Sequence, residues 1–105
     1  MNRALVAGVL LSLFAVPAWG QDAVVRVVID KYRFDPPAVT VAPGTVVEWV
    51  NEERRTSHSV IVAGQPESER LFPGETYRFR FEQPGRYPVR CGPHPEMMGI
   101  VEVAR

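Results

Sequence analysis

Apolar and polar residues alternate with a period of two along much of the chain after residue 23. In the stretch ETYRFRFE, aromatic residues alternate with arginines, and GRYPVRC repeats this pattern. Side chains two positions apart on a strand lie on the same face. We therefore expect two strands with apolar inner faces. Cys91 should point inward beside Tyr87 and Val89.

Pro- and Gly-containing turns recur through the chain at intervals of roughly eight to twelve residues, which is the spacing of short strands in a sandwich or barrel. No segment between these turns has the 3.6-residue periodicity of a good helix. The pattern predicts an all-β, Greek-key β-sandwich of about seven to eight strands. We expect strands at 24–32, 38–41, 45–51, 58–63, 75–82, 85–91 and 99–104. Because Pro88 cannot donate a hydrogen bond, its strand should be at an edge or irregular there.

The first twenty residues have the layout of a secretory signal peptide. Arg3 precedes an apolar run over 4–16, and the small residues Ala18 and Gly20 offer a cleavage site after either of them. A membrane anchor is the alternative, but the run is shorter than the ~20 residues of a spanning helix. We expect cleavage of 1–20, one domain over 21–105, a periplasmic location and no membrane association afterwards.

Charge and cysteine content restrict the remaining possibilities. The 105 residues carry 12 Lys and Arg against 12 Asp and Glu, so nucleic acid is excluded as a partner for lack of a basic surplus. The single cysteine cannot form an internal disulfide. In an oxidising compartment Cys91 is therefore buried and inert, paired between chains, or held as a metal thiolate.

Cys91, His94, Met97 and Met98 lie within eight positions, and His58 is the only other histidine. A thiolate, two imidazoles and a weak thioether form the usual ligand set of a blue-copper site, because soft sulfur suits Cu(I) and imidazole suits Cu(II). A zinc site would need four strong ligands, and the segment lacks the second cysteine of a haem-attachment or thioredoxin-like motif. Spacing alone leaves Met97 and Met98 open as the fourth ligand.

Three segments resemble the cupredoxins, and among them the amicyanin-type and small plastocyanin-like bacterial members. They are YRFDPPAVTVAPGTVVEWVNEE, HSV and PGRYPVRCGPHPEMMG. The resemblance implies one type 1 copper ion held by His58, Cys91, His94 and Met97. Met97 is favoured over Met98 because Cys-x2-His-x2-Met is the short loop of the amicyanin type.

One position departs from the pattern of the family. Members commonly have Asn after the first ligand, where its side chain ties that loop to the loop following the cysteine. Here Ser59 has a shorter side chain, so the sequence leaves this tether open. The backbone N–H of Ser59 is still expected to reach the sulfur of Cys91.

These observations predict an exported electron carrier and not an enzyme. The proposed site uses both histidines, so none remains for a second copper or an open substrate position. The resemblance implies that electrons pass through an exposed edge of His94 to transient redox partners such as a dehydrogenase or a c-type cytochrome. We expect a monomer. The alternative is a periplasmic copper-binding protein for copper delivery or resistance.

Overall fold

A computed structural model describes residues 23–105. The signal peptide expected over 1–20 lies outside the described residues. No helix in the described part of the chain is long and apolar enough to cross a membrane.

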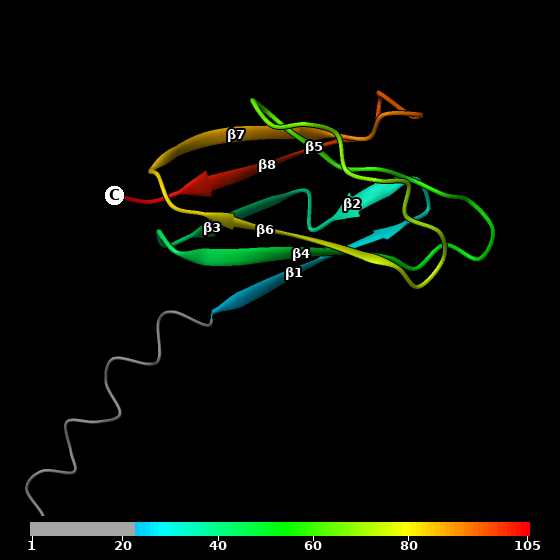
Figure 1. Cartoon of the computed structure of the whole chain (residues 1–105), viewed down its shortest axis with the longest axis horizontal. Helices are drawn as coiled ribbons and strands as arrows, with labels where there is room; N and C mark the ends of the chain where they lie inside the picture. The colour runs from blue at the N-terminus through cyan, green and yellow to red at the C-terminus, as the bar shows by residue number, and fades with distance from the viewer. Residues whose placement is uncertain (1–22) are drawn as a thin grey trace, which may run out of the picture.

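The described residues form two four-stranded sheets that face each other (Figure 1). The eight strands are β1 (Val24–Asp30), β2 (Arg33–Asp35), β3 (Ala38–Val41), β4 (Thr45–Asn51), β5 (Ile61–Val62), β6 (Thr76–Phe81), β7 (Gly85–Arg90) and β8 (Met98–Val103). One sheet has the order β2-β1-β4-β6 and the other β3-β8-β7-β5. The pairs β1–β4 and β3–β8 are parallel, whereas the other pairs are antiparallel. The all-β sandwich predicted from the alternation is confirmed.

The core lies between the two sheets, where the alternating apolar residues meet. Phe81 is buried, Tyr77 and Phe79 are half-buried on the same face of β6, and the arginines between them are exposed. The rings of Trp49 and Phe81 lie 6.4 Å apart, and Phe81 contacts Tyr87 of the opposite sheet at 5.2 Å. Burial of such rings supplies much of the apolar contact that holds the two sheets together.

Pro88 marks the place where the pairing of β5 with β7 stops. Ile61 and Val62 pair with Arg90 and Val89, and the last bond runs from the Ala63 N–H to the Pro88 carbonyl at 2.9 Å. In an extended strand the N and O of one residue face the same neighbour. The N–H that Pro88 lacks would therefore have pointed toward β5. From Pro88 back to Gly85, β7 is an edge strand, as expected.

The first predicted strand is wrong at its end. Instead of running over 24–32, β1 stops at Asp30, and a tight turn leads into β2, which the pattern did not predict. The turn residues Lys31 and Tyr32 have φ of 52° and 57°. Non-glycine residues adopt this left-handed conformation infrequently, so no sequence signal marked the turn.

The strand predicted over 58–63 is also shorter than expected, because only Ile61–Val62 is regular. His58 instead forms an isolated antiparallel bridge with Leu71, with bonds of 3.0 and 2.7 Å in the two directions. This bridge pins the segment that carries His58 to the segment before β6. The loops around His58 and after β7 lie at the end of the sandwich opposite the C-terminus (Figure 1).

Candidate metal centre

Three nitrogen and sulfur atoms converge at this end of the sandwich. Cys91 Sγ lies 3.7 Å from His58 Nδ1 and 3.6 Å from His94 Nδ1, and the two Nδ1 atoms are 3.2 Å apart. His58 and Cys91 are fully buried, whereas His94 is half-buried. Among residues 23–105 this is the one group of three or more His, Cys, Asp or Glu side chains with the spacing of a metal site. The convergence predicted for these three residues is present.

The spacing of these atoms fits a single ion. An ion bound at about 2.3 Å by sulfur and about 2.0 Å by nitrogen, with the ligands in one plane, separates sulfur from nitrogen by about 3.7 Å and the nitrogens by about 3.5 Å. The observed distances are within about 0.3 Å of these values. One thiolate and two imidazoles in this arrangement are the donors of a type 1 copper centre.

The loop after β7 is closed by its own backbone. The Met97 N–H donates to the His94 carbonyl at 2.9 Å, which completes a turn, and the Cys91 N–H donates to the Met97 carbonyl at 3.2 Å. The Met97 side chain is buried, with 2% of its surface exposed, whereas Met98 is 66% exposed and begins β8. Of the two candidate methionines, only Met97 is enclosed on the inner side of the loop.

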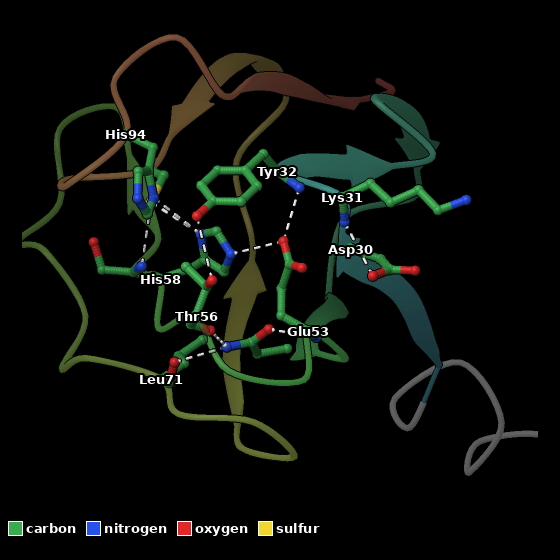
Figure 2. A network of polar contacts seen from close by, with 11 residues as sticks. Asp30, Lys31, Tyr32, Glu53, Thr56, His58, Leu71 and His94 are labelled. Carbon is green, nitrogen blue, oxygen red and sulfur yellow. Dashed lines mark hydrogen bonds and ion pairs between the residues drawn. The ribbon is translucent and has the colours of Figure 1, made fainter.

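A largely shielded carboxylate orients the ring of His58. Glu53 Oε2 lies 3.1 Å from His58 Nε2 and accepts the Tyr32 N–H at 2.7 Å (Figure 2). With Glu53 ionised, Nε2 carries the proton and Nδ1 keeps a lone pair directed at the cluster. Burial, together with the neighbouring His94, lowers the pKa of His58 against the opposing effect of Glu53. Burial by itself would raise the pKa of Glu53, but the Tyr32 N–H and His58 hold it below its usual range.

Asn51, at the end of β4, organises the loop that carries Glu53. Its side-chain amide donates to the carbonyls of Thr56 and Leu71, both at 2.9 Å, and its side-chain oxygen accepts the Glu53 N–H at 2.9 Å (Figure 2). Asn51 is fully buried, so these bonds replace the water that it would otherwise bind. The loop before His58 is therefore fixed at both ends.

Tyr32 covers the two imidazoles from the side. Its ring makes edge contacts with His58 at 5.4 Å and His94 at 4.8 Å between centroids, and its hydroxyl lies 3.2 Å from Thr56 Oγ1 (Figure 2). The left-handed turn between β1 and β2 directs the ring to this place. Tyr32 is itself 47% exposed, so it forms part of the surface around the cluster.

Ser59 connects the two loops that carry the cluster. Its N–H lies 3.4 Å from Cys91 Sγ, as expected from the sequence. Its hydroxyl accepts the Gly92 N–H at 2.9 Å and donates to Glu67 Oε2 at 2.6 Å. The shorter side chain therefore maintains a tether between the loops, with a carboxylate added to it.

Comparisons with known proteins agree with this geometry. The profile of the cupredoxin-like domain matches residues 3–103. The chain belongs to the cupredoxin-like family. Amicyanin-alpha of Methylorubrum extorquens is 35% identical, over 97% of this chain and 87% of that protein. Amicyanin of Paracoccus versutus is 32% identical, over 98% and 95%.

Solved structures of the cupredoxin fold superpose on this chain. A reduced Trp-to-Tyr variant of amicyanin gives a TM-score of 0.73 at 26% identity, over 78% of this chain and 83% of that one. A copper-containing nitrite reductase from Thermus scotoductus gives 0.71 at 31% identity over 77% of this chain. The match spans only 22% of the reductase, so it concerns one part of a larger enzyme.

Sequence reasoning missed three residues that surround the cluster: Tyr32, Glu53 and Glu67. The sequence pattern places Tyr32 in a strand, and the carboxylates reach the site from irregular loops. A partial signal existed for Glu53, since a carboxylate five residues before a ligand histidine is close enough to receive its second ring proton. No comparable signal marks Glu67, which depends on how its loop folds back.

Proposed function

We propose that this protein is a small exported blue-copper electron carrier in which His58, Cys91 and His94 hold one copper ion and Met97 is its weak axial ligand. The supporting observation is the convergence of one sulfur and two Nδ1 atoms at distances that suit a single ion. The burial of Met97 and the exposure of Met98 support Met97 as the fourth ligand.

When bound, copper supplies a one-electron change between Cu(II) and Cu(I), and the protein side chains control its surroundings. Glu53 holds the proton on His58 Nε2, which leaves Nδ1 available as a ligand. The Ser59 N–H stabilises the negative charge of the Cys91 thiolate. Burial of both ligands keeps water out, so little solvent has to rearrange when the charge at the site changes.

Electrons would enter and leave at His94, because it is the one of the three clustered ligands that reaches the surface. Pro93, Pro95 and Met98 are exposed beside it, and none of them is charged. Glu96, also exposed in this loop, adds one carboxylate. A small, mostly apolar patch suits brief docking with a redox partner, such as a dehydrogenase or a c-type cytochrome. The proposal includes a monomer that works in the periplasm after removal of 1–20.

An electron carrier fits the chain better than an oxidase or a nitrite reductase. The chain has two histidines, and both belong to the same cluster. A catalytic copper site needs further ligands and an open position for substrate. The copper-delivery alternative requires exposed, exchangeable sulfur, whereas Cys91 and Met97 are enclosed.

Titration of the purified mature domain with Cu(II) tests this function. One equivalent should produce an intense visible thiolate-to-Cu(II) absorption band, and reduction should abolish it reversibly. Cys91→Ser should remove the band because it removes the thiolate, while the exposed Met98→Ala serves as the matched control and should retain it. Colourless binding of Cu(I) alone would instead indicate delivery, and a band that survives in Cys91→Ser would reject the proposed ligand set.

A further inference from the structure

The hydroxyl of Ser59 makes two hydrogen bonds, one as a donor and one as an acceptor. It donates its proton to Glu67 Oε2 at 2.6 Å and accepts the Gly92 N–H at 2.9 Å. The first distance is that of a charge-assisted O–H···O⁻ bond, which is roughly twice as strong as a neutral one. Glu67 therefore fixes the direction of the hydroxyl, and the lone pairs of Ser59 remain available to Gly92.

The backbone brings Glu67 to this place. Its neighbour Ser68 donates its N–H to the Val60 carbonyl at 2.9 Å, and the Ser68 hydroxyl accepts the Val60 N–H at 2.9 Å. The bridge between His58 and Leu71 fastens the same segment three residues further on. The loop of Glu67 thus runs beside the segment that carries His58 and is attached to it on both sides of Ser59.

Because Gly92 has no side chain, the carboxylate of Glu67 can lie directly against it. A Cβ atom built on Gly92 would fall 2.1 Å from Glu67 Oε2 and 2.8 Å from Ser59 Oγ. Any larger residue after Cys91 would therefore displace Glu67. Glu67 is exposed at the surface, and within residues 23–105 no cation forms an ion pair with it. Ser59 is the side chain that donates a hydrogen bond to its carboxylate.

We propose that Glu67 is a positioning residue for the metal centre, acting through Ser59 to fix the loop that begins at Cys91. This inference rests on the proposed copper site and adds a regulator of its redox potential. Ser59 bonds both the residue after the thiolate and, through its N–H, the sulfur itself. A negative charge held beside this pair favours Cu(II) over Cu(I), so Glu67 lowers the midpoint potential.

Amide hydrogen exchange at Gly92, measured by NMR on the copper-free protein, tests the tether without requiring copper. Glu67→Ala should speed exchange at Gly92 roughly tenfold, which is the order expected for a weakened hydrogen bond. Glu67→Gln keeps an acceptor and should fall between Glu67→Ala and the natural protein. The matched control is Glu69→Ala, which removes an exposed carboxylate two residues along and should leave Gly92 unchanged.

A double-mutant cycle separates action through Ser59 from a general loosening of the loop. In Ser59→Ala the tether is already absent, so adding Glu67→Ala should cause no further change at Gly92. Equal exchange in the natural protein and Glu67→Ala would overturn the proposal. An additive effect in the double variant would overturn it as well.

Voltammetry of the copper-loaded variants tests the effect on the centre. Glu67→Gln should have a higher midpoint potential than the natural protein, whereas Glu69→Gln should not. An unchanged or lower potential in Glu67→Gln would overturn the tuning role. If no variant and not even the natural protein binds copper, the proposed function fails, and the exchange measurement still decides whether Glu67 holds the loop.

Discussion

Glu48 and Glu53 lie five residues apart, are nearly equally shielded from solvent and each bond two groups. They nevertheless belong to different regions, the outer face of a sheet and the surroundings of the metal centre. The Glu48 side chain is 14% exposed, on the outer face of the sheet, and bonds Arg26 at 3.3 Å and Arg78 at 3.1 Å. The Glu53 side chain is 12% exposed and bonds the Tyr32 N–H and the buried ring of His58. The partners of Glu48 are long side chains more than half exposed, whereas those of Glu53 are a backbone N–H and a fully buried ring.

This difference shows why similar burial does not imply similar importance. A carboxylate between exposed arginines can be replaced by water at little cost. Water cannot replace a carboxylate that bonds a fully buried imidazole at so little cost, because removal of the carboxylate leaves a polar ring nitrogen without a partner. The outer face of the sheet should therefore tolerate substitution of Glu48. The end of the sandwich that carries His58, Cys91 and His94 should not tolerate loss of the Glu53 hydrogen bond.

The largest expected effect on stability comes from Met97, which is buried, in contrast to its exposed neighbour Met98. Met97→Ala should lower the free energy of unfolding of the copper-free protein by about 2–5 kcal/mol, because it leaves a cavity beside the cluster. Met98→Ala should change it by no more than about 0.5 kcal/mol, since Met98 is exposed. Urea denaturation measures both.

Met97→Leu separates packing from ligation. It keeps most of the buried volume and should cost less than about 1.5 kcal/mol in the copper-free protein. The visible spectrum and potential of its copper form should still change, because the thioether is lost. A spectrum identical to that of the natural protein would contradict Met97 as the axial ligand.

The next effect contrasts the two carboxylates directly. Glu53→Ala should lower copper affinity about 10–100-fold, as removal of a partner that orients a ligand does. It should also lower the free energy of unfolding of the copper-free protein by about 1–3 kcal/mol. Glu48→Ala is the control and should cost less than about 1 kcal/mol, with copper affinity unchanged. Competition with a chelator measures the affinities, and equal losses in both variants would contradict the comparison.

The smallest effect is the pH dependence that Glu48 contributes. The hydrogen bond from Arg78, together with the charges of both arginines, lowers the pKa of Glu48 against the opposing effect of its burial. Because the folded pKa lies below the unfolded one, this stabilisation is fully present above the ordinary glutamate pKa of 4.5 and is lost as the pH falls through the folded pKa. Denaturation of the copper-free protein between neutral and acidic pH should show a shallower acid limb in Glu48→Gln. An unchanged limb would show that Glu48 adds nothing.

The regular part of the fold was predictable because it repeats one local rule. Aromatic and arginine positions alternate in β6, and burial in the structure follows that alternation. The turn at Lys31 and Tyr32 was not predictable, because neither residue is a turn former. Its conformation is supported by a bond from the Tyr32 N–H to Glu53, twenty-one residues away.

The candidate site divides in the same way. Cys91 and His94 could be recognised because they lie in one short loop, and His58 because it was the only histidine left. Of the carboxylates beside them, Glu53 is marked only by its closeness in sequence to His58. Glu67 could not be recognised, since its contact with Ser59 exists only after its loop has folded back. The identity of the candidate ligands is indicated by scarcity and spacing, whereas their orientation follows from tertiary structure.

Pro88 has a consequence for how the molecule behaves in a crowded compartment. The short β5 leaves part of β7 uncovered, and an uncovered strand can template the addition of a foreign strand. Pro88, at the boundary where Ala63 makes the last bond of β5, has no N–H on that side, so a chain that paired with the uncovered part could not continue its ladder past Pro88. The interruption at Pro88 thereby limits edge-to-edge aggregation of the sandwich.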